Sequence, residues 1–275
     1  MKKISLLSLL FFVFNMATAQ QEISTAYATQ ATNMFAPLDK NRIPHKVLLD
    51  YGFEYTNLKA YNGTLSDSTV VDVPTLKHIY NTIFSSRVTS ATTGFINPNN
   101  FDSNWKNRTA GTITVSGLYY KYNAFINDAI NLGKVNFVNN QFQDKFVSGV
   151  WQNPYQEFQA FAMAPAISKY EGLSFTVKIP STIFYSNYQS LVQSIQIDFG
   201  NGAGYVTVPF NQNVTISYAT EGVKTWKYKL NLTNGTSLLS QSKIDVKQGV
   251  TTIPWGTSTV STSAMAATSV ASSTI

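Results

Sequence analysis

The clearest structural pattern of the chain lies in Ser194–Val208, SIQIDFGNGAGYVTV, and in Val214–Val246, VTISYATEGVKTWKYKLNLTNGTSLLSQSKIDV. Apolar and polar residues alternate in both parts, and glycine-rich turns interrupt the alternation. Because successive side chains of a β-strand point to opposite faces, this pattern predicts strands with one buried and one solvated face. We therefore expect the last third of the chain to form a small antiparallel β-sandwich.

The longest predicted strand shows the alternation most clearly. Its apolar face carries Trp226, Tyr228, Leu230 and Leu232. Polar residues stand between them, so one face suits a core and the other suits water. Asn234-Gly235 follows, and we predict a type I′ hairpin turn there, in which both central residues have positive φ.

Three turn signatures of this region occur in a fixed order. They are Asp198-Phe199-Gly200-Asn201-Gly202, then Tyr218-Ala219-Thr220-Glu221-Gly222, then the Asn-Gly turn after the long strand. In this order they resemble the PKD family of Ig-like domains, although Ile197 and Lys224 stand where that family commonly has aromatic residues. The resemblance covers residues 166–248 and implies an Ig-like antiparallel β-sandwich.

Residues 34–165 are expected to form a β-rich region that contains one or two helices. The strongest helix candidate spans Asp72–Arg87, with Asp72 as its N-cap and an apolar stripe at helical spacing. Thr89–Arg108 is predicted to be an irregular connection. Period-2 alternation predicts strands near residues 113–115, 120–122, 134–137, 145–151, 158–163 and 173–179. Ser116-Gly117 is predicted to be a bulge or turn between the first two, and the boundary to the sandwich is placed near Pro165–Gly172.

Both ends of the chain carry segments outside the predicted fold. Residues 1–19 have two lysines, a short apolar run and a small-residue cleavage site, which is typical of an export signal cut near Ala19. Residues 20–33 form a polar leader, and residues 249–275 form a Ser/Thr/Ala-rich linker that is expected to be truncated. No later segment reaches the roughly 20 apolar residues of a membrane-spanning helix. The mature chain is therefore expected to be secreted or held on the outer cell surface.

Composition excludes several classes of function. The chain has no cysteine, a formal net charge of +6 and only 12% charged residues. Disulfide and thiolate chemistry are thus absent. Nucleic-acid binding needs a dense basic stripe, whereas the lysines of this chain are scattered, so nucleic acid is not an expected partner.

The residues also lack the usual catalytic motifs. Only His45 and His78 are present, and no zinc, nucleophile-elbow or phosphate-loop motif occurs. His78 lies off the apolar stripe of the predicted helix and is expected to be solvated. Carboxylate pairs for glycoside hydrolysis can be drawn formally, as Asp50 with Glu54 or Glu157 with Glu171, but their spacing does not favour them over surface acids. We therefore expect no catalytic residues and no cofactor in this chain.

Asp198 and Asn201 leave two interpretations open. Their side-chain oxygens suit Ca²⁺, a hard cation that takes oxygen ligands. Alternatively, they accept hydrogen bonds from the backbone of their own turn, which is the commoner role of Asp and Asn in such turns.

Aromatic residues of the β-rich region are the candidates for ligand contact. They are Trp105, Tyr119, Tyr120, Tyr122, Trp151 and Tyr155. Exposed rings on a sheet can stack on sugars, whereas rings buried in a sandwich core need no ligand. Because Tyr119 and Tyr120 point to opposite faces of a strand, at least one of the two could be exposed, although core packing is the favoured interpretation of these rings.

The function predicted from these features is presentation or weak recognition by an exported, non-catalytic surface module. Its partner would be a polysaccharide or a cell-surface protein. Two alternatives stay open: the chain is the accessory front part of a larger secreted hydrolase, or it is an inert spacer.

Overall fold

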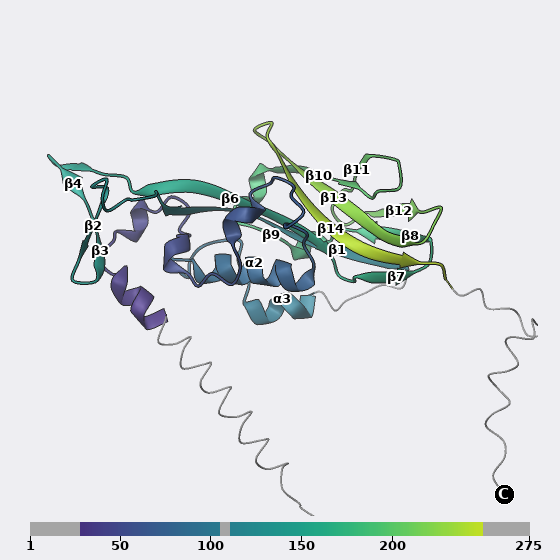
Figure 1. The fold of residues 1–275 in the computed structure, drawn as a ribbon, viewed down its shortest axis with the longest axis horizontal. Coiled ribbons are helices and arrows are strands. Elements are labelled where there is room, and N and C mark those ends of the chain that lie inside the picture. Colours follow the sequence, from purple (N-terminus) through teal and green to yellow (C-terminus); the bar gives the residue numbers. More distant parts are fainter. Residues whose placement is uncertain (1–27, 105–110, 250–275) are drawn as a thin grey trace, which may run out of the picture.

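The computed structural model describes residues 28–104 and 111–249. The predicted signal peptide and nearly all of the predicted linker lie outside these ranges. The molecule is mainly β, as predicted, and contains several sheets. It is elongated, with a two-sheet sandwich toward one end and two small hairpins at the other (Figure 1).

The first sheet is built around one long strand, β1 (Thr112–Phe125). One edge of β1 pairs antiparallel with β6 (Tyr155–Pro165), and the other edge pairs in parallel with β8 (Ser174–Lys178) and then β9 (Phe184–Ser186). β12 (Asn213–Ser217) completes the sheet beside β8. Strands from both sides of the predicted boundary near Pro165 therefore lie in one sheet.

The second sheet has the strand order β11-β10-β13-β14-β7. Its strands are β10 (Val192–Asp198), β11 (Tyr205–Thr207), β13 (Gly222–Leu232), β14 (Ser237–Lys247) and β7 (Lys169–Glu171). The pairings among β10, β11, β13 and β14 are antiparallel, as predicted. β7 pairs with β14 in parallel, as β8 and β9 pair with β1. The sandwich therefore contains three parallel strand pairings among antiparallel ones.

The main core lies between the two sheets. The predicted apolar face of β13 is buried there, with Trp226, Tyr228 and Leu230 fully inaccessible. The first sheet contributes residues from β1 and β6 to the same core, namely Ile113, Val115, Tyr119, Phe161 and Met163. The core thus crosses the predicted boundary near Pro165, and β1 belongs to the sandwich.

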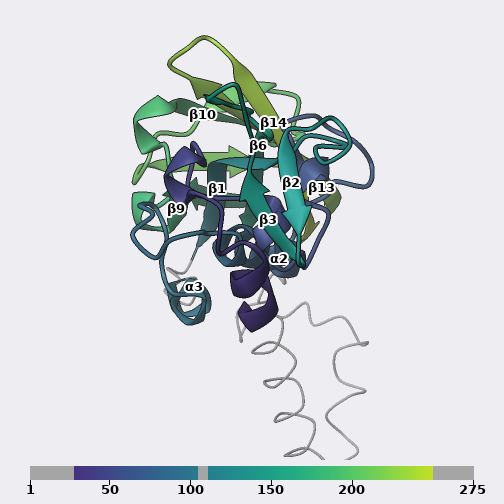
Figure 2. The ribbon, with the colours of Figure 1, turned by 90° about the vertical axis from the view of Figure 1, so that its left-hand side faces the viewer.

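A helical layer covers the other face of the first sheet (Figure 2). α2 (Val73–Ser85) matches the predicted helix, and the Asp72 side chain accepts a hydrogen bond from the Thr75 amide at 2.8 Å. The buried stripe of α2 packs against β1 and against three alanines of β6, whose small size admits the helix. β1 is therefore covered on both faces. In the two described ranges, none of the helices has the length and apolarity needed to cross a bilayer.

Two local predictions in this layer and its sheet are wrong. Residues 89–104 are not wholly irregular, because α3 (Pro98–Asn104) begins where the Asn97 side chain accepts a hydrogen bond from the Asn99 amide. β1 also runs without a bulge through Gly117. A Cβ on Gly117 would meet Met163 Cγ at 2.7 Å, so glycine leaves room for the side chain across the sheet.

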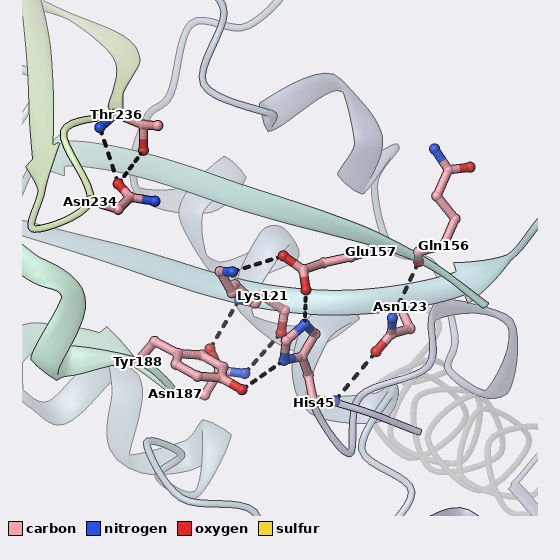
Figure 3. Close-up of polar contacts among 9 residues, drawn as sticks. All are labelled: His45, Lys121, Asn123, Gln156, Glu157, Asn187, Tyr188, Asn234 and Thr236. Carbon is pink, nitrogen blue, oxygen red and sulfur yellow. Dashed lines mark hydrogen bonds and ion pairs between the residues drawn. The ribbon is translucent and has the colours of Figure 1, made fainter. Parts of the chain in front are cut away.

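The hairpin after β13 is present but uses a different turn. Gly235 has a φ of 82°, whereas Asn234 is not among the residues with positive φ. The Gly235 amide donates to Leu232 O at 3.0 Å, and Thr236 donates from its amide and its hydroxyl to Asn234 Oδ1 (Figure 3). One left-handed residue therefore suffices, in place of the two that a type I′ turn requires.

The far end of the molecule, residues 126–154, is called the hairpin end below. It contains two two-stranded sheets, formed by β2 (Val135–Val138) with β3 (Gln141–Asp144) and by β4 (Phe146–Val147) with β5 (Val150–Trp151). The predicted strand at 145–151 is therefore a tight hairpin, because Ser148 and Gly149 both adopt positive φ.

A small separate core anchors the hairpin end to the start of the described chain. Phe35, Leu38 and Leu48 pack there with Val135 and Tyr155. Short 3₁₀ turns complete the structure at Lys40–Arg42, Leu49–Tyr51, Leu58–Tyr61, Ser181–Ile183 and Gln189–Leu191. The second of these turns ends at Gly52, whose amide donates a hydrogen bond to the Leu49 carbonyl.

Candidate functional site

A polar cluster lies where the sandwich stops covering β1 and β6. Tyr119 and its partner Phe161 still belong to the main core. The next two pairs on the same face of the sheet are Lys121 with Gln159 and Asn123 with Glu157. The face thus changes from apolar to polar within one residue pair.

His45 is the centre of this cluster (Figure 3). Its Nδ1 lies 2.8 Å from the Tyr188 hydroxyl, and its Nε2 lies 2.8 Å from Glu157 Oε2. Lys121 Nζ donates to the other carboxylate oxygen, Glu157 Oε1, at 2.8 Å. We call His45, Lys121, Glu157 and Tyr188 the His45 cluster.

Backbone contacts position the histidine. The His45 amide donates to Asn123 Oδ1 at 3.3 Å, and the Asn123 amide donates to Val47 O at 2.8 Å. Lys46 adopts a φ of 55°, a left-handed conformation that is uncommon outside glycine. Its ammonium group donates to two backbone carbonyls, those of Lys40 and Asn41. The backbone around His45 and the side chains of the His45 cluster therefore both fix the position of the imidazole.

Asn187 completes the edge of β1 beside the cluster. The pairing of β9 with β1 ends at Ser186. The Asn187 side chain then accepts from the Lys121 amide at 3.0 Å and donates to the Lys121 carbonyl at 2.8 Å. The Asn187 side chain thus makes the two backbone hydrogen bonds that a further residue of β9 would make. Tyr188, the next residue, lies beside the imidazole.

The electrostatics of the cluster favour an ionised Glu157. Partial burial by itself raises the pKa of this carboxyl, but hydrogen bonds and positive charge from Lys121 and His45 outweigh it, so the net shift is downward. The Glu157 side chain remains 51% exposed, whereas that of His45 is 6% exposed. The neighbouring Tyr119 hydroxyl is buried without a hydrogen-bond partner, and burial with the nearby Glu157 raises its pKa to about 12.

The hydrogen bonds of the His45 cluster connect distant parts of the chain. Tyrosine hydroxyl, imidazole and carboxylate are arranged in sequence, as nucleophile, base and orienting acid are in hydrolytic triads. Both nitrogens of His45 and both oxygens of Glu157 have partners within the cluster. The arrangement joins four chain segments, and the side chain of His45 is almost completely buried.

The acids of the two carboxylate pairs either accept backbone hydrogen bonds or lie in different sheets. Asp50 accepts from the Phe125 amide at 2.8 Å, and Glu54 accepts from the Leu58 amide at 3.2 Å. Glu157 lies on β6 of the first sheet, whereas Glu171 lies on β7 of the second. His78 is exposed, as expected.

Asp198 and Asn201 each make the local hydrogen bond of a turn residue. Asp198 Oδ1 accepts from the Gly200 amide at 2.9 Å, and Asn201 Oδ1 accepts from the Ala203 amide at 3.2 Å. Within residues 28–104 and 111–249, no group of three or more His, Cys, Asp and Glu residues could hold a metal ion. The geometry therefore supports the turn interpretation of these two residues.

The predicted aromatic ligand residues are mostly in the cores. Tyr119, Tyr120 and Tyr122 are fully buried, and Tyr155 is 6% exposed. Neither Tyr119 nor Tyr120 is at the surface, because the second sheet covers one face of β1 and helices cover the other. Trp105 lies outside the described residues.

Trp151 is the remaining ring of that set, and it is half-buried at the hairpin end. Its indole Nε1 donates to Asp144 Oδ1 at 2.9 Å, and the Arg42 guanidinium lies 5.3 Å from its ring centroid. The ring therefore already has a cationic partner on its face, where a sugar would stack.

Exposed apolar residues gather at the hairpin end, which sequence reasoning did not single out. The structure describes eleven exposed large hydrophobic residues, and seven of them fall within residues 130–150. These seven, called the apolar set below, are Ile130, Leu132, Phe137, Val138, Phe146, Val147 and Val150. Their exposure ranges from 40% to 63%. Because scattered single residues are normal on a surface but gathered ones mark contacts, this end is the strongest candidate for an interaction surface.

A pocket lies within the hairpin end. Its volume is about 280 Å³, and its lining includes Ile130, Val135 and Phe142, with Asp128 as the charged residue. Ligand sites are usually about 300–1,000 Å³. The pocket is therefore of a size for one side chain.

No protein-family model matches this sequence, and no curated protein is similar to it in sequence.

Proposed function

We propose that the protein is an exported, non-catalytic docking module that contacts its partner through the hairpin end. The observation that carries the proposal is the concentration of seven of the eleven exposed large apolar residues in residues 130–150. Apolar surface left in water is unfavourable, at roughly 25 cal/mol per Å². A partner that covers these side chains would recover that free energy.

The His45 cluster fits the role of a scaffold in the proposal, because it joins distant segments of the chain. Its hydrogen-bonding groups are satisfied by one another, and it joins the His45 segment, β1, β6 and the turn at Tyr188. Such a cluster keeps the base of the hairpin end in a fixed orientation relative to the sandwich. The export part of the proposal depends on the predicted signal at residues 1–19.

A binding experiment with matched variants tests the proposal. The two most exposed members of the apolar set, Leu132 at 61% and Val150 at 63%, are replaced together as L132D/V150D. V223D is the control, because Val223 is equally exposed at 65% but lies on β13 of the sandwich. Purified protein is titrated onto immobilised cell-envelope material from the producing organism.

We expect L132D/V150D to bind the envelope material at least tenfold more weakly than the unchanged protein, and V223D to bind like it. Binding that L132D/V150D leaves intact would contradict the proposed surface. Cleavage of envelope polysaccharide that E157Q abolishes would contradict the non-catalytic assignment.

A further inference from the structure

The hairpin end is electrically neutral on a cationic chain. Residues 126–154 contain two lysines and two aspartates, so their formal charge is 2 − 2 = 0, whereas the whole chain carries +6. An anionic membrane would be attracted by an excess of basic residues. The hairpin end lacks that excess, and two copies of it can meet without repulsion.

The apolar set also offers enough area for a protein contact. Seven large side chains that are 40–63% exposed present on the order of 600 Å² of apolar surface. A standard protein interface buries roughly 800 Å² on each partner. Phe137 and Val138, and likewise Phe146 and Val147, are neighbours in a strand and point to opposite faces of it. A partner that covers both faces of the hairpins would therefore bury an area that approaches one half of a stable interface.

The local structure is suited to a partner of the same kind. Each of the two hairpins is a sheet of only two strands, and no further strand pairs with either one in the described ranges. Unpaired strand edges accept strands from another chain. The pocket of about 280 Å³, which is lined in part by Val135 of β2 and Phe142 of β3, is large enough for one apolar side chain of the partner.

The position of the hairpin end permits such a contact. It lies at one extreme of the long axis, and the sandwich lies toward the other (Figure 1). Two molecules that meet at their hairpin ends would keep their sandwiches apart. Contacts between identical chains are commonly two-fold symmetric, with the same patch used on both copies.

From these observations we infer that the partner of the hairpin end is a second copy of this chain, in a two-fold symmetric dimer. The inference rests on the proposed function, because it names the partner of the same surface. The two hairpins and the apolar set of each copy cover those of the other, and both sandwiches point outward.

Sedimentation and light scattering of the mature chain test the inference. We expect a mass that rises with concentration to twice that of the monomer, for the unchanged protein and for V223D. L132D/V150D should weaken self-association at least tenfold. Since the contact is apolar and neutral, raising the salt from 0.1 M to 1 M should leave it intact. A protein that stays monomeric at 100 μM, or a dimer that L132D/V150D leaves unchanged, would overturn the inference.

The absence of cysteine allows a second, independent readout. Single variants V150C, L132C and V138C place one thiol on the hairpin end, and V223C places one on the sandwich as a control. Under mild oxidation we expect at least one hairpin-end variant to give disulfide-linked dimers in several-fold excess over V223C. Equal cross-linking of all four variants would overturn the inference.

Vesicles separate this inference from the proposed function. A monomeric protein that cosediments with phosphatidylcholine/phosphatidylglycerol vesicles through the apolar set would overturn the dimer and retain the docking surface. A monomer that binds envelope material through the same residues would likewise overturn the dimer and retain the docking surface.

Discussion

The sandwich and the hairpin end use the same local elements but bury them differently. In the sandwich, Trp226 and Tyr228 of β13 are inaccessible to water, because the first sheet covers them. At the hairpin end, Phe146 and Val150 lie in the β4–β5 hairpin with 48% and 63% of their surface exposed. Alternation and turn residues therefore determine that strands form, whereas burial depends on whether another layer of the structure packs over them.

The largest expected difference between the two regions is in the free energy of unfolding that is lost when an aromatic residue is truncated to alanine. Trp226→Ala leaves a cavity between the sheets and should cost about 3–5 kcal/mol of the free energy of unfolding. Phe146→Ala removes a ring that is half in water and should cost less than about 1 kcal/mol. Chemical denaturation of both variants measures the difference. Equal losses would mean that the hairpin end is part of the cooperative core.

A smaller effect is expected where β1 is covered on both faces. Gly117→Ala places a methyl group 2.7 Å from Met163 Cγ and should destabilise the protein by about 1–3 kcal/mol. Met163→Ala in the same chain should make the added methyl group less costly. A double-mutant cycle measures this coupling. Independent effects of the two changes would show that the close approach is not what selects glycine.

The smallest effect concerns the His45 cluster, which lies between the two regions. The folded-state pKa of Glu157 is below its ordinary value of 4.5, so its ionised form stabilises the fold above that pH. This contribution is lost as the pH falls through the lowered pKa. Since the carboxylate is half exposed, Glu157→Gln should cost about 1 kcal/mol or less at pH 7 and nothing at strongly acidic pH.

Thermal unfolding between pH 3 and pH 7 measures this difference. Tyr188→Phe is the control, because it removes a hydrogen bond to His45 and leaves the Glu157 charge in place. Its stability relative to the unchanged protein should vary less with pH in this range. A Glu157→Gln deficit that persists unchanged at pH 3 would contradict the assigned role of the charge.

Local patterns were sufficient to predict α2 and most strands. Asp72 and the apolar stripe after it identify the helix, and alternation identifies β8, β10 and β13. The run Leu118-Tyr119-Tyr120 also contained a usable signal. Consecutive large apolar residues within a strand indicate burial on both faces, whereas strict alternation indicates burial on one.

The His45 cluster could not be found in this way. His45 meets Glu157 across 112 positions of sequence and Tyr188 across 143. No periodicity marks any of the three, and their approach depends on where the second sheet ends above β1. The apolar set was equally hidden, because its valines and phenylalanines have the same strand pattern as residues that the sandwich buries.

The shared first sheet also constrains the order in which the chain can fold. β1 is translated and, if the predicted signal operates, exported well before β8 and β9, whose strands complete its second edge. Until β13 and β14 follow, one face of β1 and β6 has no cover. We therefore expect a fragment that stops at Pro165 to aggregate or to need a chaperone. Because the helical layer before β1 covers its other face, the chain from that layer through β14 must be present before both faces of β1 are buried.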